Sequence, residues 1–197
     1  MGRHNAAPDY NDEWTRRPTA RWLVATQGGV VHPTHGDLGS APMFSGTVSY
    51  PTPDLIWTGG GRTEWCETKG KSVFAPNRAG RPETGYDLAR HHDYIKAEQA
   101  SGFPVRVVFW HRQDNLVLMQ YISVLRRVGR ENPRAGYGRG GMFYVDRAHL
   151  IVIGAYDRML AAYGQDVVVP AEWKPVVISP PDPPATPPQL DLFRRRS

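Results

Sequence analysis

The stretch TPDLIWTGGGRTEWCETKGKS, residues 52–72, decides the fold of this chain. Two apolar runs flank three glycines, which allow a tight reversal, so the stretch predicts two neighbouring antiparallel strands. Side chains two positions apart on a strand share a face, so Glu67 and Lys69 point the same way. Asp54, at the start of the first run, can reach the same spot from the neighbouring strand. Two carboxylates and the backbone carbonyl of Thr68 suit a hard cation such as Mg²⁺ or Mn²⁺.

The residues after this stretch predict a helix and a further strand. From Tyr86 to Gln99 the apolar residues have helical spacing, and Gly102 is placed to end the helix. The run from Pro104 to Trp110 is almost entirely apolar, which predicts a buried strand. The predicted order is therefore strand, strand with the Glu-x-Lys triplet, helix, strand.

This pattern resembles the PD-(D/E)XK nuclease superfamily, and residues 52–110 are most similar to its Holliday junction resolvase and phage endonuclease branches. The resemblance implies an α/β fold with a restriction-endonuclease-like core, in which helices flank a central mixed sheet. It also implies that Asp54, Glu67 and Lys69 are catalytic, and that Asp54, Glu67 and Thr68 hold the metal. Junction resolvases of this group are dimers, so the resemblance allows a homodimer, but the sequence does not settle the oligomeric state. The alternative is a solvated Glu/Lys pair on an ordinary sheet edge.

The resemblance also implies residues that contact DNA, because polar residues of the corresponding helix line the scissile phosphate. They are Lys71, Arg90, His91, His92 and Tyr94. Adjacent helical residues diverge by about 100°, so one of the two histidines is expected to face the core or the sheet. Core packing explains Tyr94 equally well.

Many members of the superfamily carry an additional acidic metal ligand on their first helix. Here Glu13 precedes Pro18 and lies earlier than such a ligand should, and Asp9, Asp12 and Asp37 are no better placed. No further metal ligand is therefore assigned. The single cysteine, Cys66, is expected to serve in packing.

Other segments predict shorter elements or a loop. The predicted elements are a helix over Ala20–Gln27 with Thr19 as its N-cap, a strand from Val30, strands over Leu116–Val128 and Met142–Val145, and a helix over Tyr156–Tyr163. Residues 126–141 are rich in glycine and arginine. They indicate either a mobile loop that contacts phosphates or a long solvated hairpin loop.

Composition favours a protein that binds nucleic acid. The chain has 197 residues, a net charge of +5, and four lysines among its 24 basic residues, which leaves 20 arginines. Arginine suits phosphate contacts, although a GC-rich genome also favours arginine over lysine. No apolar run has the length of a membrane helix, so we expect a cytoplasmic, nucleoid-associated protein of a bacterium or phage, without membrane contact. Residues 1–9 are expected to be flexible and 10–168 to form one nuclease domain.

The C-terminal segment predicts a tethered docking peptide. Eight prolines between Pro170 and Pro188 predict an extended, disordered linker over residues 169–188. The following residues, Gln189, Leu190, Asp191, Leu192 and Phe193, resemble the motif by which bacterial replication and repair proteins bind the β sliding clamp. A chance apolar tail, whose three terminal arginines contact DNA, is the alternative.

These features together predict a metal-dependent DNA endonuclease of repair, recombination or replication that is tethered to the sliding clamp. The spacing of the seven histidines and one cysteine does not predict a zinc site, and no phosphate-binding loop of the ATPase type is present. Two alternatives stay open. One is a non-catalytic adaptor of the same fold that binds DNA or the clamp, and the other is the cleaving subunit of a transposase or defence complex.

Overall fold

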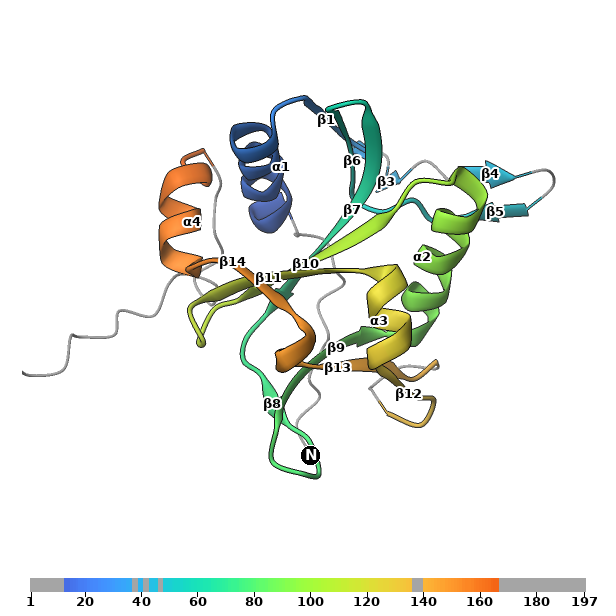
Figure 1. Cartoon of the computed structure of the whole chain (residues 1–197), viewed down its shortest axis with the longest axis vertical. Helices are drawn as coiled ribbons and strands as arrows, with labels where there is room; N and C mark the ends of the chain where they lie inside the picture. The colour runs from blue at the N-terminus through green and yellow to red at the C-terminus, as the bar shows by residue number, and fades with distance from the viewer. Residues whose placement is uncertain (1–12, 37–38, 41–42, 46–47, 136–139, 167–197) are drawn as a thin grey trace, which may run out of the picture.

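A computed structural model describes residues 13–36, 39–40, 43–45, 48–135 and 140–166, and a six-stranded sheet lies at its centre (Figure 1). The strand order is β1-β6-β7-β10-β11-β14. Only β7 and β10 run parallel to each other, and every other neighbouring pair is antiparallel. The strands are β1 Val30–Pro33, β6 Leu55–Gly59, β7 Arg62–Lys71, β10 Val105–His111, β11 Leu116–Tyr121 and β14 Ile151–Gly154.

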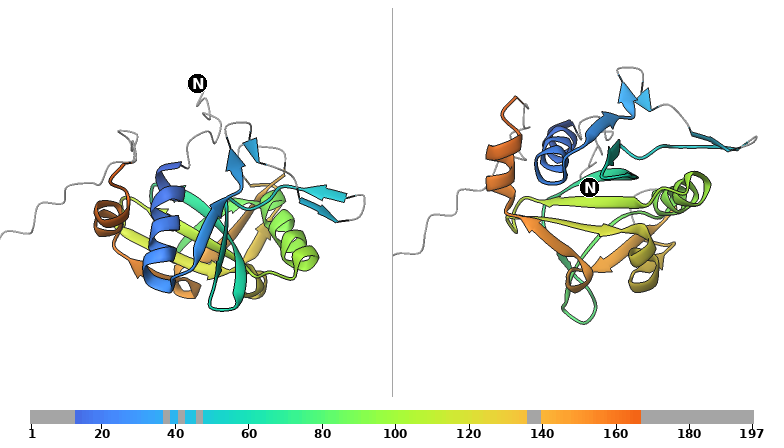
Figure 2. Two further views of the ribbon diagram at one scale, coloured as in Figure 1. Left: turned by 90° about the horizontal axis from the view of Figure 1, so that it is seen from above. Right: turned by 45° about the horizontal axis from the view of Figure 1, so that its top comes forward.

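Helices cover both faces of this sheet, as Figure 2 shows. On one face lie α1, Glu13–Gln27, and α4, Tyr156–Tyr163, side by side. On the other face lie α2, Leu88–Ser101, and α3, Ile122–Val128. The predicted α/β class, with a mixed central sheet flanked by helices, is confirmed.

Alternation along the two parallel strands divides the core into two clusters. Val107 and Phe109 of β10 pack towards α2 and α3, whereas Val108 and Trp110 pack towards α1 and α4. Cys66 is buried in the second cluster, which confirms its packing role. The central strand β10 has hydrophobic side chains on both faces, as expected for a strand that is covered by helices on both sides.

A second sheet packs beneath α2 and α3 and was not predicted. Its order is β12-β13-β9-β8, with β8 Ala75–Pro76, β9 Pro82–Asp87, β12 Arg130–Asn132 and β13 Met142–Asp146. A 3₁₀ turn, Arg147–His149, leads from β13 into β14. Two short hairpins, β2 His35–Gly36 with β3 Gly39–Ser40 and β4 Met43–Ser45 with β5 Val48–Tyr50, precede β6.

The first helix is longer than predicted, because it begins at Glu13 and carries Pro18 in its interior. Trp14 is buried against Trp110 and Tyr156, and this packing stabilises the first turn although proline removes one backbone donor. Thr19 is not the N-cap; its hydroxyl donates to the carbonyl of Thr15 inside the helix.

Two further element predictions were wrong at their boundaries. The run Leu116–Val128 is not one strand, because β11 ends at Tyr121 and α3 follows. Ile122 and Leu125, three residues apart, are both fully buried, which is the spacing of a helix face. The second helix starts at Leu88, because Tyr86 belongs to β9.

Other predictions agree with the structure. The buried strand over residues 104–110 is present as β10, Met142–Val145 lies within β13, and Tyr156–Tyr163 is α4. Residues 130–132 of the glycine- and arginine-rich segment form β12, and residues 136–139 lie outside the described residues. The segments predicted as a flexible N-terminus, a proline-rich linker and a clamp-binding peptide also lie outside them. No helix among the described residues is long and apolar enough to cross a membrane.

Candidate active site

Asp54 and Glu67 meet where β6 begins beside the middle of β7. The backbone N–H of Asp54 donates to Oε2 of Glu67 at 3.1 Å. Oδ2 of Asp54 accepts from the backbone N–H of Thr68 at 2.9 Å and from its hydroxyl at 2.8 Å. Both carboxylates are about 5% exposed. The hairpin that the sequence predicted thus brings the two acids together and fixes their orientation with backbone donors.

Lys69 and Tyr94 hold the Glu67 carboxylate from two further directions. The ammonium of Lys69 lies 2.6 Å from Oε1 of Glu67, and its side chain is 19% exposed. Tyr94, on α2, is buried and its hydroxyl hydrogen-bonds to Glu67. Burial and the nearby Glu67 raise the pKa of Tyr94 well above its usual value, so this hydroxyl stays protonated and donates.

The first helix contributes Thr15 and Arg16 to the site. The hydroxyl of Thr15 donates to that of Thr68 at 3.1 Å, and Nε of Arg16 lies 3.8 Å from Oδ1 of Asp54. The helix lies directly on β7, because a Cβ at Gly70 would come within 2.6 Å of the Trp14 ring. Neither Thr15 nor Arg16 was predicted from the sequence, since the search along the first helix was for an acidic residue.

The electrostatics of this site favour a bound cation. Burial raises the pKa of Glu67 above its ordinary value, and the charge of Asp54 raises it further, while Lys69 and Tyr94 oppose the shift. Two buried carboxylates side by side therefore carry unfavourable negative charge, which a divalent cation would relieve.

The oxygen donors at this position suit magnesium or manganese. The N–H and C=O of a strand residue point to the same side, so the carbonyl of Thr68 faces the side on which its N–H meets Asp54. Asp54, Glu67 and this carbonyl are all hard oxygen donors. Among the residues that the structure describes, no group of three or more His, Cys, Asp or Glu side chains could hold a metal. A metal here would therefore depend on two carboxylates, the carbonyl and water.

The structure separates the predicted DNA-contacting residues into buried and exposed ones. His91 is 1% exposed, its ring stacks on Phe143 with ring centroids 3.6 Å apart, and its Nδ1 is hydrogen-bonded to the Tyr86 hydroxyl at 2.8 Å. Because its ring lies in the core, His91 is not placed to contact DNA. Tyr94 is also buried, and it reaches Glu67 instead.

The remaining three lie at or near the surface. His92 is about half exposed and bonds to Glu131 at 3.0 Å. Arg90 is 48% exposed, with Asp93 of the same helix 3.8 Å away. Lys71 is the partly exposed last residue of β7, two positions beyond Lys69. The expectation that one of the two histidines faces the core agrees with the burial of His91.

Two of the solved structures that this chain resembles are nucleases. A Holliday junction resolvase, Hjc of Archaeoglobus fulgidus, matches 77% of this chain and 96% of its own, with 12% identity and a TM-score of 0.44. A nuclease from a fusselovirus matches 74% of this chain and 83% of its own, with 9% identity and a TM-score of 0.40. No family model and no curated protein sequence matches.

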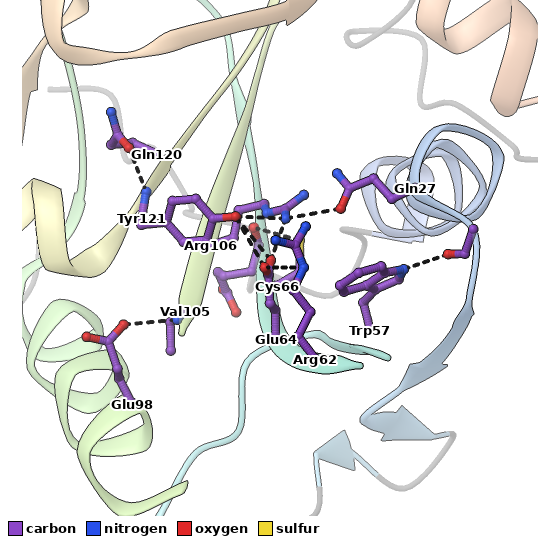
Figure 3. Close-up of polar contacts among 12 residues, drawn as sticks. Gln27, Trp57, Arg62, Glu64, Cys66, Glu98, Val105, Arg106, Gln120 and Tyr121 are labelled. Atoms are coloured by element: carbon purple, nitrogen blue, oxygen red, sulfur yellow. Dashed lines mark hydrogen bonds and ion pairs between the residues drawn. The ribbon is translucent and has the colours of Figure 1, made fainter. Parts of the chain in front are cut away.

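A second buried ion pair lies near the N-terminal ends of β7 and β10 (Figure 3). Arg106 is 2% exposed and pairs with Glu64, and its guanidinium also donates to Tyr121 at 2.9 Å and to Gln27 at 3.3 Å. Arg62 lies 3.4 Å from the same glutamate. This cluster joins α1 to three strands, and a buried pair of this kind is costly to break because one charge is left uncompensated. Its members are bound to one another, which favours a structural role.

Proposed function

We propose that this protein is a metal-dependent DNA endonuclease that hydrolyses phosphodiester bonds. The observation that carries the proposal is the convergence of Asp54, Glu67 and Lys69 at one position of the sheet, with both acids buried and oriented by hydrogen bonds. An accessible surface pair of glutamate and lysine would need none of these contacts. The net charge of +5 suits a polyanionic substrate.

The side chains have separate roles in the proposed hydrolysis. Mg²⁺ or Mn²⁺, held by Asp54, Glu67 and the Thr68 carbonyl, would activate a water molecule and offset charge at the phosphorus. Lys69 would neutralise charge that develops on the phosphate oxygens, an electrostatic role that an ammonium group can fill. Its contact with Glu67 places the ammonium next to the acid that would bear the metal.

The biological setting of the proposal comes from the C-terminal peptide. Residues 189–193 match the type of motif that docks into the bacterial β sliding clamp, and the proline-rich linker before them would act as a tether. Tethering would raise the local concentration of the nuclease at DNA under replication, repair or recombination. A homodimer would present two active sites to a branched substrate.

A second candidate function is a non-catalytic DNA-binding adaptor of the same fold. The observation in its favour is that each carboxylate already has a basic neighbour, Arg16 beside Asp54 and Lys69 beside Glu67. Such internal pairing can neutralise the site without a metal. The cleaving subunit of a transposase or defence complex would have the same chemistry as the first proposal but a partner that selects the target.

A cleavage assay on branched, single-stranded, mismatched and plain duplex DNA, with and without Mg²⁺, separates these candidates. We expect metal-dependent cleavage that Glu67→Gln or Asp54→Asn abolishes while DNA binding is retained or slightly tighter, because less negative charge faces the phosphate. Asp157→Asn, at an exposed carboxylate of α4, is the matched control and should keep full activity. Undiminished cleavage by Glu67→Gln would reject the site, and DNA binding without cleavage on every substrate would favour the adaptor.

A further inference from the structure

A hairpin arm formed by residues 75–82 projects from the second sheet, as the green loop below the body in Figure 1 shows. In this hairpin β8 pairs with β9, with Pro76 opposite Pro82 and Ala75 opposite Glu83. The neighbouring strand β13 ends where Asp146 meets Glu83. Residues 76–82 therefore extend beyond the end of β13, where β9 has only β8 as a neighbour.

The tip of the arm is held by its own hydrogen bonds. The backbone N–H of Asn77 donates to the carbonyl of Arg81 at 2.8 Å, and that of Gly80 donates to the carbonyl of Asn77 at 2.9 Å. The Asn77 side chain also accepts from Ala79 and Arg81. Gly80 has φ of +74°, which is the left-handed position of a three-residue hairpin loop with a bulge. The tip is thus a defined turn.

The base of the arm is anchored in the core. Phe74 is 7% exposed and stacks on His111 with ring centroids 3.8 Å apart. Its backbone N–H donates to Asp114 at 2.9 Å, and the guanidinium of Arg147 lies over its ring. These contacts fix the direction in which the arm leaves the body, immediately after the strand that carries Glu67 and Lys69.

The arm carries positive charge, and part of it has no ion pair among the described residues. Residues 72–82 contain two arginines and no acidic residue. Arg81 lies 3.2 Å from Asp146, whereas Arg78, at the tip, is exposed and has no ion pair among the described residues. The residues from Arg78 to Pro82 are all exposed, so the arm adds little apolar burial to the folded state.

We propose that this arm docks in a groove of duplex DNA, with Arg78 against the phosphates, while Asp54 and Glu67 engage the strand to be cut. The inference rests on the proposed nuclease function. A two-stranded β-ribbon is one of the elements that the major groove of B-DNA admits, and small residues at the tip, Ala79 and Gly80, let the backbone approach closely. Arginine is well suited to phosphate oxygens.

The chain length bounds where the arm would touch. Arg78 lies eleven positions after Glu67, and at about 3.3 Å per residue these eleven steps span at most about 36 Å. One turn of duplex DNA is about 34–36 Å long. The arm would therefore contact the duplex within about one helical turn of the cut. This contact would bind the DNA next to the cleavage position.

Binding measurements on uncleaved DNA test the arm independently of catalysis. In the Glu67→Gln background, Arg78→Ala should weaken duplex binding and lower the slope of log K against log salt concentration by about 1, the effect of one lost phosphate contact. Arg78→Lys should restore most of the slope because it retains the charge. Arg158→Ala, at an exposed arginine of α4 on the other face of the central sheet, is the matched control and should leave binding unchanged.

A thiol cross-link locates the contact. The only cysteine of the chain, Cys66, is buried, so Arg78→Cys supplies a single accessible thiol. With duplexes that carry a thiol tether at successive positions, we expect cross-linking within about ten base pairs of the cut and none for Arg158→Cys. An unchanged salt slope in Arg78→Ala, or no cross-link at any position, would overturn the proposal. If Arg78→Cys cross-links to DNA but the protein with wild-type Glu67 cleaves no DNA, the nuclease function would be rejected, and the DNA contact of the arm would be retained.

Discussion

Tyr94 of α2 donates its hydroxyl to the carboxylate of Glu67 on β7, and so a helix on one face of the sheet orients an acid of the candidate active site. Both residues are almost completely buried. A metal ligand that is hydrogen-bonded in this way loses less conformational freedom when it binds the ion. Tyr94 is therefore a positioning residue, and its substitution leads to the first prediction.

Tyr94→Phe should lower the affinity for Mg²⁺ by roughly 10- to 100-fold, the usual effect of losing a partner of a metal ligand. The ring keeps its packing, so thermal unfolding should change little. Calorimetric titration of the protein with Mn²⁺ measures the affinity directly. Tyr86→Phe is the matched control, because that hydroxyl bonds to His91 and its loss should spare metal binding. Equal affinities in the wild type and Tyr94→Phe would mean that the tyrosine serves only packing.

Lys69→Ala should reduce the rate of cleavage at saturating DNA by roughly 10² or more, as expected for one preorganised electrostatic contact in a buried site. Metal binding should persist, because the lysine donates no ligand. Single-turnover kinetics separates this effect from product release. Lys96→Ala, at an exposed lysine near Asp93 on α2, is the control. A rate unchanged by Lys69→Ala would assign the lysine a structural role.

The choice of metal is a third test. Cleavage should require Mg²⁺ or Mn²⁺ and fail with Ca²⁺, which tolerates looser coordination and activates water poorly. DNA binding with Ca²⁺ should nevertheless be at least as tight as without metal, because the ion still offsets the two carboxylates. Cleavage assays and binding assays in parallel buffers make the comparison. Zinc that stays bound through purification, with unfolding on chelation, would contradict the oxygen-ligand site.

The stability of the fold should decrease as the pH falls from about 6.5 towards 4. Burial lowers the pKa of His91 and of His111 to about 4. The unfolded chain then takes up these protons at higher pH than the folded one, and each histidine costs up to about 3 kcal/mol across this range. His91→Gln should remove part of the slope in urea denaturation, whereas His149→Gln, at an exposed histidine, should not. A slope that both variants share with the wild type would locate the effect elsewhere.

The terminal peptide should recognise its partner independently of the nuclease domain. Leu192→Ala with Phe193→Ala, or deletion of residues 189–197, should abolish binding to a bacterial β clamp and leave cleavage of naked DNA nearly unchanged. The linker from Pro170 to Pro188 can span about 60 Å at the polyproline rise of about 3.1 Å per residue, so both contacts can exist at once. A synthetic peptide of residues 186–197 with no affinity for the clamp in calorimetry would identify the tail as a basic extension.

The centre of the site could be predicted because it depends on short-range rules. Asp54, Glu67 and Lys69 are placed by one hairpin and by the two-residue period of a strand, and the structure brings them together. The contributions of Tyr94 and Arg16 could not be predicted in the same way. Each depends on how a separate helix is rotated against the sheet, and that is set by packing of residues far apart in the chain.

The second sheet was missed for a different reason. Its strand β8 has two residues and β12 has three, so neither shows a period. Leu116–Val128 was misread because a continuous apolar run fits a buried strand as well as a helix face, and only the burial of Ile122 and Leu125 distinguishes them. The interior position of Pro18 was missed because proline has a low helix propensity. Packing of the buried Trp14 stabilises the turn before it, and this packing is not visible in the sequence.

The pairing of β9 with β13 also affects the order in which the protein takes shape during synthesis. Asp54 and Glu67 are 13 residues apart in the sequence. Glu83, at the base of the arm, pairs with Asp146, which lies 63 residues later. Long-range closures are slower and entropically costlier than local ones. We expect pulsed hydrogen exchange to show protection of the β6–β7 hairpin before that of β9. A nascent chain would then acquire its pair of acids well before the arm that is proposed to dock on DNA.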